Sequence, residues 1–123
     1  MQFYSTNRKT SPVSLREAVV RGLAADRGLF MPEVIRRFPP AFYQNMKEMT
    51  LREISFVVAE AFFGEDVEAG KLKEIVDETL NFDIPLVKVA DNRYSLELFH
   101  GPTLAFKDVG ARFMARLLAY FNK

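Results

Sequence analysis

The residue with the clearest capacity for covalent chemistry is Lys107, which lies in the segment LFHGPTLAFKD at residues 98–108. The Gly-Pro pair in this segment predicts a turn ahead of a helix, so Lys107 falls in or beside the first helical turn. The partial positive charge at a helix start disfavours a protonated amine, and burial against Leu104 and Phe106 would have the same effect. A neutral amine can condense with an aldehyde cofactor, whereas an ordinary solvated surface lysine, the commoner case, has no such role.

The elements that must hold this lysine are a pair of strands before it and an amphipathic helix after it. Residues 84–90 and 94–99 flank the turn-prone pair Asp91-Asn92 and are typical of a β-hairpin. Helix 108–121 is predicted by apolar residues at helical spacing, namely Val109, Phe113, Met114, Leu117, Leu118 and Phe121. The expected order around Lys107 is therefore strand, tight turn, helix.

Local end signals predict further helices nearer the amino terminus. Ser14 with Glu17 three residues later is typical of a capping box, and Gly22 predicts the end of that helix. Thr50 and Glu53 repeat this spacing at the start of helix 50–63, which Gly64 follows. A second amphipathic helix is indicated by the spacing of Leu72, Ile75, Val76, Thr79 and Leu80.

The remaining segments are short. Residues 3–5 predict a first strand, and residues 41–47 predict a short helix after the Pro-Pro break. Residues 22–32, GLAADRGLFMP, predict a turn-rich loop anchored by four apolar side chains, those of Leu23, Leu29, Phe30 and Met31.

Composition is that of an ordinary globular domain, with 123 residues, 49% hydrophobic and 27% charged. A formal net charge of +1 without long runs of one sign argues against a nucleic-acid or membrane-surface binder. The apolar stretches are too short for a membrane span, the first residues lack a secretory signal pattern, and there is no cysteine. We expect a cytoplasmic protein without a metal site.

Three segments of the chain resemble threonine synthases. LELFHGPTLAFKD at residues 96–108, followed by GARFMARLL, is very similar to the segment that attaches pyridoxal phosphate in that family. FYSTN at residues 3–7 and GLAADRGLFMP at residues 22–32 resemble two parts of the family's amino-terminal region. One departure is Arg27, where many members have glycine, and it predicts a different backbone at that point.

The resemblance implies a fold, a division into domains and an activity. The fold expected is α+β: the amino-terminal domain of a fold-type II pyridoxal phosphate enzyme, similar to the tryptophan synthase β subunit, truncated before most of the parallel sheet. Residues 1–85 would form a mostly helical amino-terminal domain, and residues 86–123 would begin the cofactor-binding catalytic domain. The activity implied for the parent enzyme, a lyase of threonine biosynthesis, is conversion of O-phospho-L-homoserine and water into L-threonine and phosphate.

The resemblance also assigns site residues. Lys107 matches the lysine that forms the Schiff base with pyridoxal 5'-phosphate and then acts as a general acid and base. His100, the chain's only histidine, and Thr103 are candidates for substrate contacts or for purely structural roles in the turn. Asp108 is expected to cap the helix, and a chemical role is its less favoured alternative.

A complete cofactor site is not expected from these residues alone. A phosphate dianion is usually held by backbone N–H groups of a glycine-rich loop, and no two of the six glycines are close enough to form one. We therefore expect the chain by itself to be inactive and to lack a stable internal aldimine. The apolar stripe of helix 109–121 is expected to face the sheet that the chain lacks, and its exposure would favour self-association.

Three alternatives stay open at this point. One is another enzyme of the same cofactor fold, a dehydratase or a β-replacement enzyme acting on serine or cysteine derivatives. A second is a non-catalytic interaction domain in which the phenylalanine-rich chain packs against a partner. The third is a related protein that keeps the fold but acts on a different phosphorylated amino acid.

Overall fold

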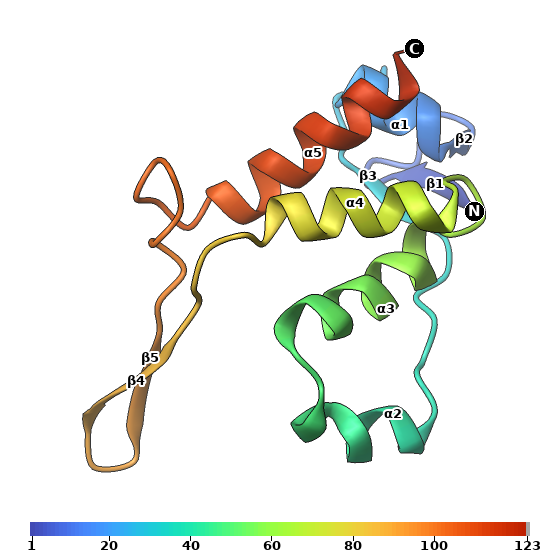
Figure 1. Cartoon of the computed structure of the whole chain (residues 1–123). Coiled ribbons are helices and arrows are strands. Elements are labelled where there is room, and N and C mark those ends of the chain that lie inside the picture. The colour runs from blue at the N-terminus through green and yellow to red at the C-terminus, as the bar shows by residue number, and fades with distance from the viewer. Residues whose placement is uncertain (123) are drawn as a thin grey trace.

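The computed structural model describes residues 1–122, which form a small α+β arrangement of two antiparallel sheets and several helices (Figure 1). Strands β1 (Gln2–Ser5), β2 (Val13–Ser14) and β3 (Phe30–Pro32) make one sheet in the order β2-β1-β3. In its register, Phe3 faces Val13 on one side and Pro32 on the other. The predicted first strand is confirmed, whereas β3 had been expected to be loop.

Helix α1 (Leu15–Arg21) follows directly on β2. The Ser14 hydroxyl accepts the Glu17 backbone N–H at 3.2 Å, as predicted for the start of this helix. The Glu17 carboxylate pairs with Arg21 at 3.0 Å, so a one-sided cap takes the place of the expected reciprocal box. Gly22 ends the helix with φ 71° and ψ −42°, a positive φ that glycine adopts without a Cβ clash.

Three further helices follow, and their positions agree with the predictions. Helix α2 (Pro40–Asn45) continues into a 3₁₀ turn (Met46–Glu48), and α3 (Leu51–Phe63) starts at a full capping box between Thr50 and Glu53. Helix α4 (Ala69–Thr79) buries the apolar stripe that its spacing predicts. Along residues 1–122, no helix is long and apolar enough to cross a lipid bilayer.

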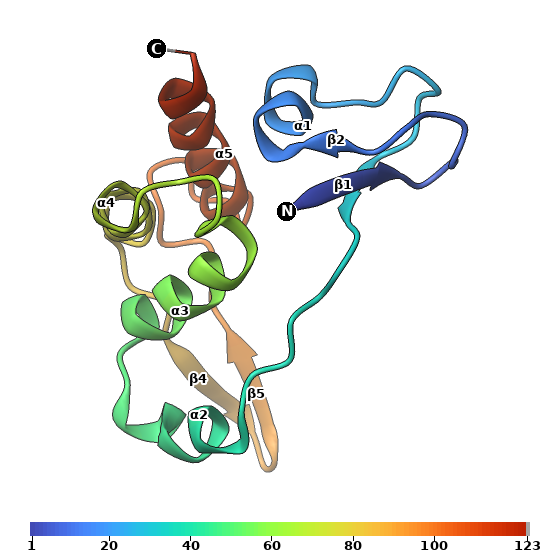
Figure 2. The ribbon, with the colours of Figure 1, turned by 90° about the vertical axis from the view of Figure 1, so that its right-hand side faces the viewer.

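The hairpin and the last helix also form where expected. Strands β4 (Leu86–Ala90) and β5 (Arg93–Leu96) pair antiparallel around a turn in which Asn92 has φ 57°. The hairpin extends away from the helices (Figure 1). Most of its side chains are exposed. Helix α5 (Asp108–Phe121) lies alongside α4 and ends next to α1 (Figures 1 and 2).

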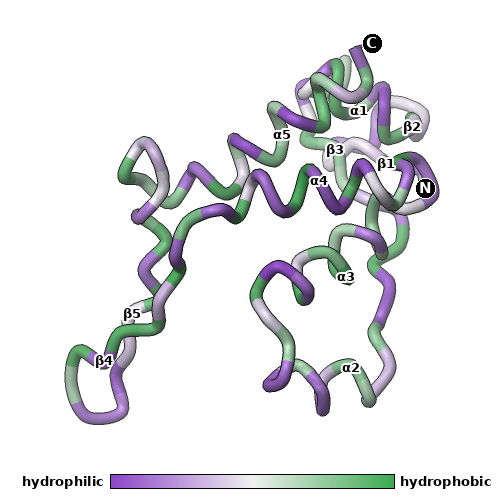
Figure 3. Tube along the Cα trace, in the orientation of Figure 1, coloured by the Kyte–Doolittle hydropathy of each residue, from purple (hydrophilic) through white to green (hydrophobic). Residues whose placement is uncertain are grey.

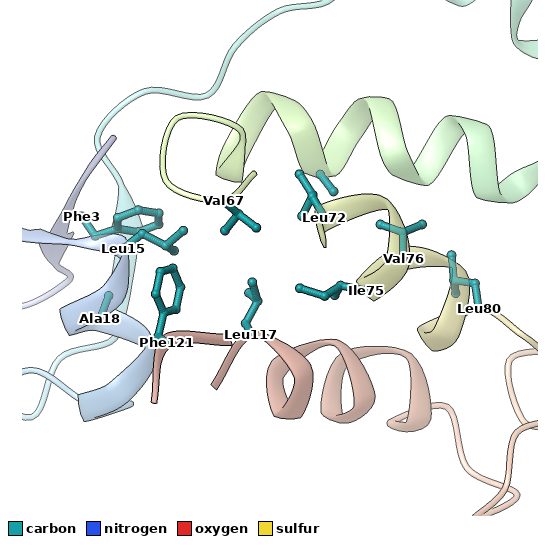
Figure 4. Close-up of a cluster of buried hydrophobic side chains, with 11 residues drawn as sticks. Phe3, Leu15, Ala18, Val67, Leu72, Ile75, Val76, Leu80, Leu117 and Phe121 are labelled. Carbon is teal, nitrogen blue, oxygen red and sulfur yellow. The ribbon is translucent and has the colours of Figure 1, made fainter. Parts of the chain in front are cut away.

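One hydrophobic core joins the sheet to the helices. Phe3 and Leu15 meet Leu117 and Phe121 of α5, while Leu72 and its neighbours on α4 continue the cluster (Figure 4). The expected orientation of α5 is therefore wrong. The apolar stripe of α5 faces the chain's own core, because Leu117 and Phe121 are buried in it and Val109 and Phe113 pack against it.

This packing bears on two of the other expectations. Self-association through the stripe of α5 stays a prediction, because Leu117 and Phe121 are buried but Val109 and Phe113 are only partly buried. Helix α5 lies in the predicted second domain but shares its core with the first, and the boundary at residue 85 stays a prediction. The prediction that four apolar side chains anchor the loop at residues 22–32 was only partly right. Phe30 packs on the core, whereas Leu23, Leu29 and Met31 are exposed.

Candidate functional site

Lys107 lies immediately before α5, where its sequence context predicts it. Its backbone has φ −62° and ψ −17°, and its carbonyl accepts the Ala111 N–H at 2.8 Å as the first bond of the helix. The side chain is exposed, and among the described residues it forms no ion pair. The lysine thus has a fixed backbone and an accessible amine.

An open apolar groove of about 690 Å³ adjoins this lysine. Its walls come from α3, from the end of α4, from β5 and from the start of α5. Besides Lys107, the main lining side chains are those of Leu51, Leu80, Ile84, Leu96, Phe106 and Val109. Lys107 thus lies at the edge of an apolar surface. The sequence did not predict this groove, because its walls are distant from one another in the chain.

The expected shielding of Lys107 by its neighbours is wrong in this structure. Leu104 and Phe106 are 77% and 73% exposed, so neither removes water from the lysine. Both lie in the irregular segment between β5 and α5, where few elements cover them. Figure 3 shows hydrophobic stretches along the hairpin and the turn after it, the region that also includes exposed Leu86, Val89 and Leu96.

Asp108 is buried to 3% exposure and does not cap α5 in the expected way. Its Oδ2 accepts the Thr103 backbone N–H at 2.8 Å, and its Oδ1 accepts the Thr103 hydroxyl at 2.7 Å. The hydroxyl bond is the main cause that holds the pKa of the Asp108 carboxyl below its usual value, against the opposing effect of burial. The carboxylate therefore ties the turn to the start of the helix.

Gly101 makes room for this carboxylate. A Cβ at Gly101 would lie 2.5 Å from Asp108 Oδ2, closer than any real contact of this kind. The turn continues with Leu104 at φ 53°, whose N–H donates to the Gly101 carbonyl at 3.0 Å. The Gly-Pro-Thr sequence therefore forms the predicted turn, and its glycine also lets the Asp108 side chain pack closely against the backbone.

His100 lies beside this turn but is occupied by another partner. Its Nε2 forms a 2.7 Å hydrogen bond with the Glu97 carboxylate, and its ring stacks on Phe99 with centroids 4.7 Å apart. Glu97 was not singled out in the sequence, because a pair three residues apart in an irregular segment has no periodic signal. A contact between His100 and a substrate phosphate stays a prediction.

A second polar cluster joins the two amino-terminal segments singled out above, residues 3–7 and 22–32. The Asp26 carboxylate accepts the Ser5 hydroxyl at 2.6 Å, the Gly28 N–H at 2.9 Å and the Lys9 N–H at 3.0 Å. Ser5 is fully buried, and these bonds, the Ser5 hydroxyl first, hold the pKa of Asp26 below its usual value. The cluster is far from Lys107 in the chain and lies at the end of β1, the central strand of the sheet.

Comparison with known proteins gives a consistent picture. Residues 2–80 match a family model described as the threonine synthase N terminus. The chain is 41% identical over 119 residues to a threonine synthase of Haemophilus influenzae and 40% identical to one of Serratia marcescens. Each match covers 97% of this chain but 28% of the relative, so the chain spans a little over a quarter of their length.

Solved structures agree in fold. A crystal structure of threonine synthase from Escherichia coli superposes with a TM-score of 0.92 at 35% identity, covering 99% of this chain and 28% of that one. A PLP-bound threonine synthase from Brucella melitensis gives a TM-score of 0.92 at 32% identity, covering 98% and 27%. The α+β arrangement described above is thus that of the corresponding part of these enzymes.

Proposed function

Because this chain belongs to the threonine synthase family, we propose that, within a polypeptide of its relatives' length, it serves the conversion of O-phospho-L-homoserine and water into L-threonine and phosphate. The observation that carries the proposal is Lys107, an accessible amine held at a helix start inside HGPTLAFKD and beside an apolar groove. The relatives' names and the family model support the same activity.

The residues present fit one end of pyridoxal phosphate, the cofactor of the Brucella melitensis relative. Lys107 supplies the amine that would hold its aldehyde, and the open groove offers an apolar wall beside that amine. Residues 1–122 contain no glycine-rich loop for the phosphate end. When bound, the cofactor supplies stabilisation of negative charge on substrate carbon. The task of Lys107 is to hold it and to move protons at Nζ.

Because residues 1–122 contain no such loop, we propose that the chain by itself does not suffice for catalysis. We expect the isolated chain to show no turnover of O-phosphohomoserine and no borohydride-trappable cofactor on Lys107 at stoichiometric pyridoxal phosphate. Stoichiometric trapping at Lys107, located by peptide mass spectrometry, would contradict this expectation. The cytoplasmic location expected from the sequence also stays a prediction.

The decisive experiment uses the chain within a protein of its relatives' length. Lys107→Ala should abolish cofactor trapping and reduce threonine formation by several orders of magnitude, since the covalent site is lost. Lys88→Ala, at an exposed lysine of β4, is the matched control and should leave both unchanged. Full turnover in Lys107→Ala would overturn the proposal.

Substrate choice is tested with the same protein. Phosphate release and threonine formation from O-phosphohomoserine should exceed any reaction with threonine or O-acetylserine. Preference for either of the latter would indicate a dehydratase or a β-replacement enzyme. Absence of turnover with every substrate, together with no cofactor trapping, would favour an interaction domain.

A further inference from the structure

Residues 101–108 form a loop that is closed on itself by one buried carboxylate. Asp108 uses both of its oxygens on Thr103, one on the backbone N–H at 2.8 Å and one on the hydroxyl at 2.7 Å. Gly101 packs against the same carboxylate so closely that no side chain would fit there. We call these three residues, Gly101, Thr103 and Asp108, the clasp.

Little apart from the clasp holds this loop in shape. Pro102, Leu104 and Phe106 are exposed, so hydrophobic contacts contribute little to the position of residues 102–106. Two local turn bonds, from Leu104 N–H to Gly101 and from Asp108 N–H to Ala105, span only three residues each. The bonds between Asp108 and Thr103 are the longer tie, and they close the loop across five residues.

Lys107 is the last residue inside this closed loop. On its carboxyl side the backbone is fixed by α5, which is anchored in the core through Leu117 and Phe121. On its amino side the path of the chain is set by the loop that Asp108 closes. The direction in which the lysine leaves the backbone therefore depends on both the helix and the clasp.

We propose that Thr103 and Asp108 are positioning residues, whose clasp sets where the Lys107 amine stands at the edge of the apolar groove. The proposal rests on the proposed function of Lys107. Asp108 acts through the backbone, because both carboxylate oxygens already accept hydrogen bonds and the residue is almost fully buried. It is not available to exchange protons with a substrate.

The clasp itself can be tested in the 123-residue chain without cofactor. Hydrogen exchange should show the Thr103 amide protected, and Asp108→Ala should speed its exchange roughly tenfold or more, as expected for loss of a charge-assisted hydrogen bond. The circular dichroism of the helices should be preserved, because the core face of α5 is unchanged. Equal exchange in both proteins would overturn the clasp.

The effect on Lys107 requires the longer protein with bound pyridoxal phosphate. Thr103→Val removes the hydroxyl bond and keeps the backbone bond, whereas Thr103→Ser keeps both. We expect Thr103→Val to shift the pH midpoint of the visible absorption of the lysine-bound cofactor. We also expect it to lower kcat about tenfold with KM for O-phosphohomoserine within about twofold, and Thr103→Ser to restore wild-type values.

The controls separate this idea from the function it rests on. Met114→Ala, on the exposed side of α5, should leave the absorption midpoint and kcat unchanged. An unshifted midpoint and unchanged kcat in Thr103→Val would overturn the positioning role. Cofactor trapping and turnover that survive Lys107→Ala would overturn the proposed function instead, while the hydrogen-exchange result on the clasp would stand.

Discussion

Asp26 shows how one carboxylate can join segments that are distant in the chain. It accepts hydrogen bonds from Ser5, 21 residues earlier, and from the backbone of Lys9 and Gly28. A Cβ at Gly28 would lie 2.0 Å from the Ser5 hydroxyl oxygen, so the cluster leaves no space for another side chain. No local pattern in the sequence predicts this cluster, because its members follow neither helical nor strand periodicity.

Asp26 and Asp108 give the stability of the chain a defined dependence on acid. The pKa of each carboxyl is lower in the folded chain than its usual value. Between the folded and unfolded pKa values the unfolded chain binds more protons, so stability is full above about pH 4 and falls as the pH drops further. Thermal unfolding from pH 6 to pH 2.5 should show this loss.

The matched variant for this experiment is Asp26→Asn, which keeps the shape but removes the titrating group. Its melting temperature should be lower by several degrees at pH 6 and should fall less steeply with acid than that of the unmodified chain. Parallel curves for the two proteins would show that Asp26 does not contribute to the acid dependence.

Arg27 departs from the glycine common in the resembling family, yet its backbone keeps a conformation that glycine favours. Its φ of 65° lies in the left-handed region, which costs an ordinary residue on the order of 1 kcal/mol. We expect Arg27→Gly to stabilise the chain by roughly 0.5 kcal/mol after the greater entropy of glycine in the unfolded chain is counted. The melting temperature of Arg27→Gly should therefore be higher than that of the unmodified chain.

The control for Arg27→Gly is Ala25→Gly, at an exposed neighbour that lacks a positive φ. That change should lower the melting temperature, because it adds flexibility to the unfolded chain without relieving strain. Equal effects of the two substitutions would contradict the assignment of strain to Arg27.

Helices and strands with local signals were predictable from the sequence, often to the residue. Helix α5 has the predicted bounds because its apolar residues recur at helical spacing. Helix α3 starts directly after Thr50 because the capping box is a local interaction. Strand β3 was missed, since its three residues pair with β1 and carry no alternation of their own. Short strands depend on partners, and partners are not visible in a single segment.

The cap of α3 allows a quantitative test. The Thr50 hydroxyl accepts the Glu53 N–H at 3.3 Å, and Glu53 in turn accepts the Thr50 N–H at 2.7 Å. Thr50→Ala should lower the free energy of unfolding by about 1 kcal/mol, as for other side-chain caps. Urea denaturation measures the change, with Ser11→Ala in an exposed loop expected to stay within about 0.5 kcal/mol of the unmodified chain.

The arrangement of the elements was harder to predict than the elements themselves. The stripe on α5 was recognised, but its partner was not, because only the assembled fold shows that α4 and α1 cover it. The groove beside Lys107 was not predicted for the same reason. Nor were the hydrogen bonds that the Asp108 carboxylate accepts from Thr103. The identity of the candidate lysine came from a contiguous motif, which requires no knowledge of packing.

Two leucines distinguish the core from the exposed surface next to the candidate site. Leu72 on α4 is fully buried, whereas Leu104 beside the clasp is 77% exposed. Leu72→Ala should lower the free energy of unfolding by about 2–5 kcal/mol through lost burial and a new cavity. Leu104→Ala should change it by less than about 0.5 kcal/mol. Similar losses at both positions, measured in urea, would contradict the core described here.

The meeting of β1 with the end of α5 has a consequence for biosynthesis. Phe3 shares one core cluster with Leu117 and Phe121, which are synthesised more than a hundred residues after it. During elongation the apolar face of this sheet is therefore incomplete, and transiently exposed apolar surface of this kind is prone to aggregation. Closing such a long loop also delays folding, so we expect this core to be completed only after α5 has left the exit tunnel.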